Sequence, residues 1–176
     1  MTMVVVFGGG GFLGQRLVGR LTAEGMSVRV AVRYPDPARI KLRAIGFDLV
    51  TVVPADVRDS VSMADAVAGA DAVVNTVSAY VEMGNTTFEA VHVRGAETVA
   101  REAVAAGVAR LVLVSGIGAN SSSGSSYIRA RGRGEQVVCG CRHDARTLRC
   151  QHAVDLLLRL GHSLFLPWCQ SPQCRS

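Results

Sequence analysis

The stretch VVVFGGGGFLGQRLV, Val4–Val18, places four consecutive glycines between an apolar run and a segment of helical character. The run Met3–Phe7 is apolar throughout and predicts a short strand buried on both faces. Leucines recur at helical spacing after the glycines and predict a helix over Phe12–Ala23. Because ordered glycine costs backbone entropy, four in succession indicate a turn with a specific steric requirement.

Strand and helix patterns alternate along the chain after this turn. Further strands are predicted over Ser27–Val32, Asp48–Val53, Ala70–Val77 and Arg110–Ser115. Helices are predicted between them, over Asp36–Ile45, Ser60–Ala68 and Thr86–Ala106. Parallel strands need long crossovers, which helices supply, so this order predicts an α/β fold with a doubly wound parallel sheet, the Rossmann arrangement.

The helix predicted over Thr86–Ala106 is expected to be amphipathic. Its apolar face is predicted to carry Phe88, Val91, Val99 and Val104. Its solvated face is predicted to carry His92, Glu97, Arg101 and Glu102. The polar stretch Ala119–Ser126 is expected to form a flexible loop at the carboxyl edge of the sheet, where open α/β folds bind ligands.

Composition fits one globular domain, because 49% of the 176 residues are hydrophobic and 19% are charged. No apolar run reaches the ~18 residues of a membrane-spanning helix, and the N-terminus lacks a signal peptide pattern, so a cytoplasmic location is expected. Residues 1–119 hold 11 basic and 11 acidic side chains, whereas residues 120–176 hold 8 arginines and 3 acids. These arginines are scattered and no nucleic-acid motif accompanies them, so no nucleic-acid partner is expected.

Gly8, Gly11 and Gly14 follow the pattern G-x-x-G-x-x-G between the first predicted strand and helix. In this context the pattern indicates a dinucleotide site whose pyrophosphate rests on the helix N-terminus. Gly8 would allow the tight turn, Gly11 would clear the pyrophosphate's approach, and Gly14 would let the helix pack closely on the sheet. Phe12 and Leu13, at the start of that helix, are assigned to the same site. A plain tight turn is the alternative.

The end of the second predicted strand discriminates between cofactors. An acidic residue there would bind the ribose 2′-hydroxyl of NAD, but the strand is followed by Arg33, with Arg39 nearby. Arginine can bind a 2′-phosphate with two hydrogen bonds, which favours NADP over NAD. Asp36 is close enough to keep NAD as the alternative. Beyond the third strand, Asp56 is expected to accept a hydrogen bond from the adenine amino group, to serve as a helix N-cap or turn residue, or both.

Several segments resemble, in their order and spacing, the atypical and extended short-chain dehydrogenase/reductases, a superfamily that includes NAD-dependent epimerases and dehydratases. These segments are VFGGGGFLG, VRVAVR, ADVRD, GADAVVNTVS, TFEAVHVRGAETVAREAVAAGVARLVLVSGIGA and SYIRARGRGEQVV. Within that superfamily the chain is similar to the group around the accessory NAD(P)H-binding subunit of respiratory complex I and its bacterial relatives. The resemblance implies a bound nicotinamide dinucleotide, complex I subunits as partners and a peripheral place at the inner membrane.

The resemblance also implies where each part of the cofactor lies. The adenosine is expected against Arg33, Asp56 and Val57. The nicotinamide ribose is expected against Thr76, Val77 and Ser78.

Tyr127 falls where the superfamily keeps its Tyr-x-x-x-Lys motif, in which Tyr transfers the substrate proton and Lys lowers the pKa of that Tyr. The Lys position is Arg131, whose planar fork does not replace an ammonium donor to the ribose. The second Ser of the superfamily's Ser pair is Gly116, so Ser115 is expected to be the structural member and an oxyanion donor is missing. The candidate catalytic set of Tyr127, Arg131 and Ser115 is therefore incomplete. A role for Tyr127 as a surface aromatic is the alternative.

The family pattern is lost near Leu148, and all five Cys, the Trp and three of the four His follow residue 138. We therefore predict a dinucleotide-binding domain over residues 1–149 and an atypical tail over 150–176, in which the family's substrate-binding region is truncated or altered. A zinc site is the alternative for this region, although its spacing matches no standard zinc pattern and no metal is expected. Its candidate ligands are Cys139, Cys141, His143, Cys150 and His152.

Two functions follow from the resemblance and its departures. The first is an NAD(P)-binding protein of the complex I accessory-subunit type that holds its dinucleotide largely structurally. The alternative is an NADP-dependent reductase, epimerase or dehydratase that acts on a carbonyl or nucleotide-sugar substrate through Tyr127. The substitutions at Arg131 and Gly116 favour the first.

Overall fold

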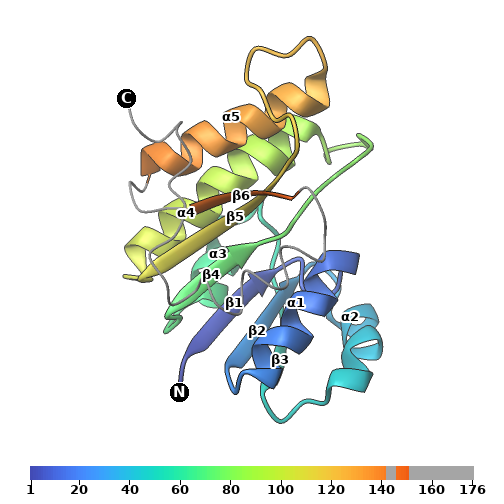
Figure 1. Ribbon diagram of the computed structural model, residues 1–176, viewed down its shortest axis with the longest axis vertical. Helices are drawn as coiled ribbons and strands as arrows, with labels where there is room; N and C mark the ends of the chain where they lie inside the picture. Colours follow the sequence, from blue (N-terminus) through green and yellow to red (C-terminus); the bar gives the residue numbers. More distant parts are fainter. Residues whose placement is uncertain (142–145, 151–176) are drawn as a thin grey trace.

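Six parallel strands form one sheet in the order β3-β2-β1-β4-β5-β6 (Figure 1). The strands are β1 (Met3–Phe7), β2 (Ser27–Val32), β3 (Val50–Pro54), β4 (Ala72–Asn75), β5 (Arg110–Gly116) and β6 (Arg146–Cys150). The computed structural model describes the backbone of residues 1–141 and 146–150 and the side chains of residues 1–141. The order confirms the predicted doubly wound sheet, and the predicted tail lies outside the described residues except for Cys150.

The central strand β1 explains the apolar run that precedes the glycines. Val4 pairs with Val28 of β2 on one side and with Ala72 of β4 on the other. Val4, Val5, Val6 and Phe7 are all buried. A strand in the middle of a doubly wound sheet is covered on both faces, so it needs a continuous apolar sequence rather than an alternating one.

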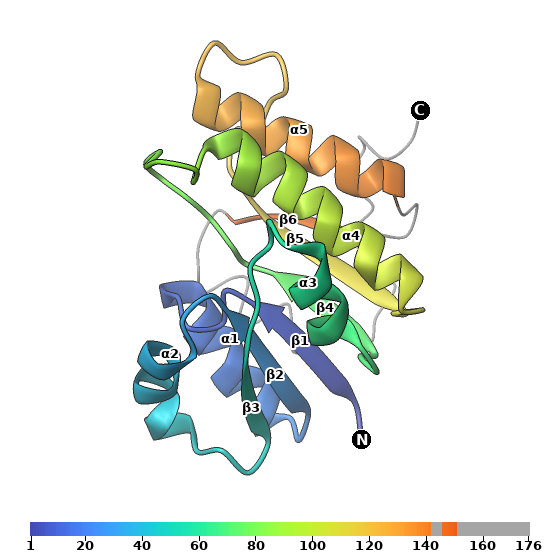
Figure 2. The same cartoon turned by 180° about the vertical axis from the view of Figure 1, so that it is seen from behind.

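Helices cover both faces of the sheet (Figures 1 and 2). The helical segments are α1 (Phe12–Ala23), α2 (Pro35–Leu42), η1 (Arg43–Ile45), α3 (Ser60–Val67), η2 (Glu89–Arg94), α4 (Gly95–Ala105) and α5 (Ser126–Cys141). On one face Leu17 and Leu21 of α1 pack in a cluster with Val4 of β1. On the other face Met63 of α3 packs in a cluster with Val5 of β1 and with residues of α4 and α5. No helix in the described part of the chain is long and apolar enough to cross a membrane.

The helix predicted over Thr86–Ala106 is divided into the π-helical turn η2 and the α-helix α4. The expectation that His92 is solvated was wrong, because His92 lies in η2 and is 7% exposed. Val104 was placed on the apolar face but is 47% exposed. A π-turn holds more residues than an α-turn and so changes which residues face inward, an effect that a uniform 3.6-residue period does not capture.

Two other differences concern the C-terminal half of the sheet. Helix α5 was not among the predicted helices, because its three glycines and three arginines hide its amphipathic pattern. The predicted fourth strand, Ala70–Val77, is observed only over Ala72–Asn75, and the residues after Asn75 turn into the crevice beside β1. The strand order reverses between β1 and β4, which is where open α/β sheets bind ligands.

Candidate functional site

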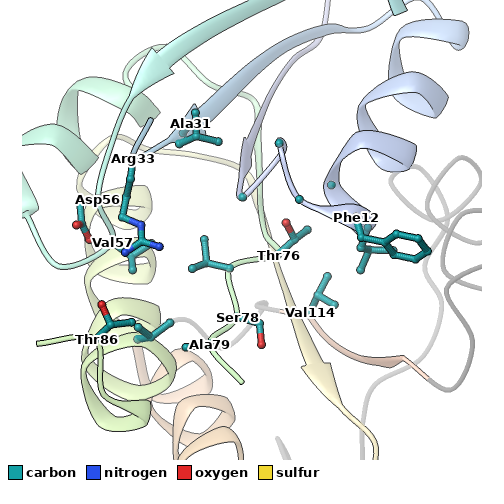
Figure 3. Close-up of a pocket in the computed structure, with 18 of the residues that line it drawn as sticks. Phe12, Ala31, Arg33, Asp56, Val57, Thr76, Ser78, Ala79, Thr86 and Val114 are labelled. Atoms are coloured by element: carbon teal, nitrogen blue, oxygen red, sulfur yellow. The ribbon is translucent and has the colours of Figure 1, made fainter. Parts of the chain in front are cut away.

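A cavity of about 610 Å³ opens at the carboxyl ends of the strands, next to the point where the strand order reverses. Its volume is in the range of cofactor pockets. In the close-up of the pocket, Arg33 and Asp56 lie together on one side and Phe12 on the other, with Thr76 and Ser78 between them (Figure 3). All the site residues predicted from the sequence line this cavity, namely Gly8, Gly11, Phe12, Leu13, Gly14, Arg33, Asp56, Val57, Thr76, Val77, Ser78, Ser115, Tyr127 and Arg131.

The glycine turn between β1 and α1 forms the floor of the cavity. Gly8 has a φ of +77°, which glycine adopts without strain, and its amide donates to the Ala31 carbonyl at 3.0 Å. A Cβ at Gly14 would run into the backbone of Gly8 and Gly9, so close packing of α1 requires glycine there. A Cβ at Gly11 would meet only the Gly8 carbonyl, at 3.2 Å, and would otherwise project into open space.

Gly11 is also the N-cap of α1, and it makes no side-chain capping bond. No acidic residue stands in the first turn of this helix. The free amides and the positive end of the helix dipole are therefore available to an anion, as the phosphate-binding pattern requires.

Gly9 and Gly10 have a steric role that the sequence pattern did not identify. A Cβ at Gly9 would lie 2.8 Å from Cγ1 of Val30 in β2. A Cβ at Gly10 would lie 2.9 Å from the Cβ of Ala38 in α2. Gly9 and Gly10 therefore let the turn pack tightly against β2 and α2.

Hydrogen bonds join the end of β4 to the end of β1 below the cavity. The Thr76 hydroxyl donates to the Phe7 carbonyl at 2.7 Å, and the Thr76 amide donates to the same carbonyl at 3.0 Å. The Val77 amide donates to Oδ1 of Asn75 at 3.0 Å. These bonds fix the direction in which Val77 and Ser78 leave the sheet toward the cavity.

We call the part of the cavity formed by Arg33, Tyr34, Lys41, Asp56 and Arg58 the Arg33 end. The Asp56 carboxylate accepts from the Arg58 amide at 3.0 Å and from Nε of Arg58 at 2.9 Å. This bonding to Arg58 holds the pKa of Asp56 below its usual range, against the opposing effect of burial. The expected acceptor for adenine is thus already paired with Arg58, a pocket residue that sequence reasoning missed. The N-cap of α3 is Asp59, whereas Asp56 is a turn residue whose carbonyl accepts from the Asp59 amide at 2.9 Å.

We call the opposite part, formed by Ser78, Ser115, Gly116, Tyr127 and Arg131, the Tyr127 end. Tyr127 and Arg131 lie one turn apart on α5, and Cζ of Arg131 is 5.3 Å from the centroid of the Tyr127 ring. Arg131 is 7% exposed, and its Nη1 donates to the Ser78 hydroxyl at 2.9 Å. Nε of Arg131 and Oγ of Ser115 are buried without a hydrogen-bond partner within the described residues.

An aromatic cluster holds Tyr127 in place. Its ring centroid lies 5.3 Å from that of Phe88, 5.6 Å from that of His92 and 5.8 Å from that of Tyr80. Nε2 of His92 is 2.9 Å from the Ala79 carbonyl, and burial lowers the pKa of His92. These contacts pack the half-buried Tyr127 against Phe88, His92 of η2 and Tyr80 in the loop after β4.

No group of three His, Cys, Asp or Glu side chains that could hold a metal ion occurs among the described residues. Of the zinc candidates, the side chains of Cys139 and Cys141 are described. His143, His152 and the Cys150 side chain lie outside the described residues.

Comparison with known proteins agrees with this geometry. The model of a family described as NAD(P)H-binding matches residues 8–138. The chain is 35% identical over 150 residues to NADH dehydrogenase [ubiquinone] 1 alpha subcomplex subunit 9, mitochondrial, of Arabidopsis thaliana, which covers 84% of this chain and 37% of that protein. It is 36% identical over 120 residues to cinnamoyl-CoA reductase 1 of Petunia hybrida, which covers 66% of this chain and 36% of that protein.

A solved structure of similar fold is a DesIV double mutant, a dTDP-glucose 4,6-dehydratase from Streptomyces venezuelae with NAD and DAU bound. Its TM-score is 0.70 at 26% identity, covering 84% of this chain and 55% of that one. The chain spans little more than a third of the length of the curated relatives described above. The family match covers most of the chain and includes the glycine turn, so this protein belongs to the NAD(P)H-binding family and is an NAD(P)-binding Rossmann-fold protein.

Proposed function

We propose that this protein binds NADPH in the cavity and holds it as a structural cofactor rather than consuming it, in the manner of the complex I accessory subunits. The observation that carries this proposal is Arg131, whose buried guanidinium bonds to Ser78 where a catalytic lysine would stand. A guanidinium stays protonated and has a fixed hydrogen-bonding geometry, which suits holding a ligand better than assisting proton transfer.

The dinucleotide would lie across the carboxyl ends of the strands. Its pyrophosphate would rest on the amides of Phe12 and Leu13, where α1 begins, because the Gly11 amide already donates to the Gly8 carbonyl at 2.9 Å. The adenosine would occupy the Arg33 end, with Val57 against the base. The nicotinamide ribose would occupy the Tyr127 end, beside Thr76, Val77 and Ser78.

The charges of the Arg33 end support the preference for NADPH over NADH. Arg33, Lys41 and Arg58 line the cavity there, whereas the single acid, Asp56, is paired with Arg58. Asp36, which kept NAD open as the alternative, is bonded to Arg39 at 2.7 Å, and neither lines the cavity. A 2′-phosphate would therefore meet cations without a competing free carboxylate.

Lys41 offers a direct test of where the 2′-phosphate lies, because it is the only lysine in the chain. Acylation of Lys41 by an amine-reactive reagent should be slowed by saturating NADPH and much less by saturating NADH. The N-terminal amine serves as the internal control in the same mass spectrum. Equal protection by both cofactors would contradict the proposed place of the 2′-phosphate.

Association with respiratory complex I, from the cytoplasmic side of the inner membrane, is part of the proposal. It rests on the likeness to the Arabidopsis subunit, which covers residues on both sides of the cavity. Co-purification of complex I subunits with the tagged protein from solubilised membranes would support this partner. Recovery of the tagged protein alone, with intact complex I in the same extract, would contradict it.

The second candidate function is an NADP-dependent reductase, epimerase or dehydratase. The specific observation in its favour is that Tyr127 faces the same cavity as the cofactor residues and is held there by Phe88 and His92. The likeness to cinnamoyl-CoA reductase supports it as well. Mass spectrometry of the cofactor released from purified protein, followed by turnover assays with carbonyl compounds and nucleotide sugars, separates the two functions. A retained and unreacted NADPH supports the structural role, whereas ordinary turnover supports the enzyme.

A further inference from the structure

Arg131 and Gly116 meet at the Tyr127 end of the cavity, although they come from α5 and β5. A Cβ at position 116 would lie 2.8 Å from Nε of Arg131, 3.3 Å from its Cδ and 3.5 Å from its Cζ. Well-packed carbon atoms lie about 3.5–4.0 Å apart, so a side chain at 116 cannot share this space with the guanidinium where it now lies. Backbone conformation is not the reason for glycine here, because Gly116 is not among the glycines with positive φ.

The Arg131 side chain is restrained along its length. Nη1 is bonded to Ser78, Cζ lies over the Tyr127 ring, and the whole side chain is 7% exposed. Its Nε faces the bare backbone of Gly116 and has no hydrogen-bond partner within the described residues. The atoms nearest to position 116 are therefore the middle of a held side chain and not a flexible end that could move aside.

We infer that Arg131 and Gly116 form one mutually dependent pair, in which the guanidinium fills the space that a side chain at position 116 would need. The arginine at the lysine position and the glycine at the second serine position are then linked, because each requires the other. Arg131 is a positioning residue in this pair: through Ser78 it joins α5 to the segment that follows β4. The inference deepens the proposed structural holding of the dinucleotide, because a hydroxyl at 116 becomes possible only after the arginine is removed.

A double-mutant cycle tests the pair, with melting temperatures measured on the full chain without added dinucleotide. Gly116→Ala should lower the melting temperature of the parent by roughly 3–10 °C, the range expected for an overpacked methyl group in a protein of this size. In the Arg131→Ala background, where Cδ, Nε and Cζ are all absent, the same substitution should cost less than ~2 °C. Gly124→Ala is the matched control, because a Cβ there meets nothing within 4 Å and its cost should be small in both backgrounds.

Equal cost of Gly116→Ala in both backgrounds would overturn the inference, since the clash would then not involve the guanidinium. If Gly116→Ala alone fails to fold, folding of the Arg131→Ala, Gly116→Ala double variant supports the pair. Failure of the double variant beside a folded Arg131→Ala variant overturns it. Rescue by a second substitution is a result that a merely local loss of stability would not give. Because the unliganded protein is measured, the outcome is independent of whether NADPH binds.

Discussion

At the scale of single residues, Gly11 decides whether an anion can reach the start of α1. Gly11→Val should weaken NADPH binding ~10-fold or more, because the branched side chain would project into the open space above the turn rather than into the protein. Gly19→Ala, farther along α1, is the control and should leave the affinity unchanged, because a Cβ there makes only ordinary contacts with Ile45. Titration of both variants measures this, and unchanged affinity in Gly11→Val would place the pyrophosphate elsewhere.

Arg33 is the residue on which cofactor choice depends. Arg33→Ala should remove about 1.5–3 kcal/mol of NADPH binding by loss of a charge-assisted contact, and should change NADH binding much less. Arg39→Ala is the matched control, because Arg39 is bonded to Asp36 and does not line the cavity. Parallel titrations with both cofactors measure the difference, and equal weakening of NADPH and NADH would reject the assignment.

At the scale of elements, the π-turn η2 makes the stability of the fold depend on pH through His92. Burial lowers the pKa of His92 below 6.5. The positive charge of Arg131 lowers it further, whereas the hydrogen bond to the Ala79 backbone raises it. As the pH falls, the His92 imidazole is therefore protonated at a higher pH in the unfolded chain than in the folded protein. The contribution of His92 to stability is therefore complete above pH 6.5 and decreases as the pH falls from 6.5 toward the folded-state pKa.

The prediction is that the melting temperature of the parent declines more steeply between pH 7 and pH 5 than that of His92→Gln, which keeps a donor for the Ala79 carbonyl. The Asp56–Arg58 pair does not interfere, because the pKa of Asp56 is lowered from 3.8 and its contribution is lost only below that pH. If the melting temperatures of the two proteins decline equally between pH 7 and pH 5, His92 has no such role.

The elements also show which features of the structure can be predicted from the sequence. Strands β1 to β5 and the glycine turn were predicted because buried strands and tight turns leave local patterns, and the predicted cofactor residues all line one cavity. The burial of His92 was missed, because a π-turn is stabilised by tertiary packing, here by Gly134 of α5 against the His92 carbonyl. The pairing of Asp56 with Arg58 and the contact of Arg131 with Gly116 depend on side-chain positions that spacing along the chain does not fix.

At the scale of the whole molecule, residues 1–149 are proposed to form the nucleotide-binding fold, and residues 151–176 to add little to it. Deletion of 151–176 should leave the melting temperature nearly unchanged, because the family pattern is lost near Leu148 and the described residues before 139 already form a core cluster on each face of the sheet. A cooperative fall of more than ~5 °C would mean that the tail packs into the core. Zinc in the full-length protein that is lost on Cys139→Ser would likewise contradict this account.

Catalysis requires several elements together, and in this chain α5 and β5 bring Arg131 and Gly116 into contact. The parent should turn over ketones and nucleotide sugars far more slowly than ~1 s⁻¹, because it lacks both the lysine and the second hydroxyl, and loss of one oxyanion donor alone costs about 10²–10³ in rate. Arg131→Lys with Gly116→Ser should raise the rate, whereas Gly116→Ser alone should not. Turnover of ~1 s⁻¹ or faster in the parent, abolished by Tyr127→Phe, would establish the reductase function instead.

The central claim is that this chain binds NADPH in the cavity between the glycine turn and Tyr127. Calorimetric titration of the purified, cofactor-stripped protein with NADPH and with NADH tests it most directly. The account predicts one equivalent of NADPH per chain, bound about 10-fold or more tightly than NADH, in keeping with the cations at the Arg33 end. Absence of binding by either dinucleotide, or tighter binding of NADH, would contradict it.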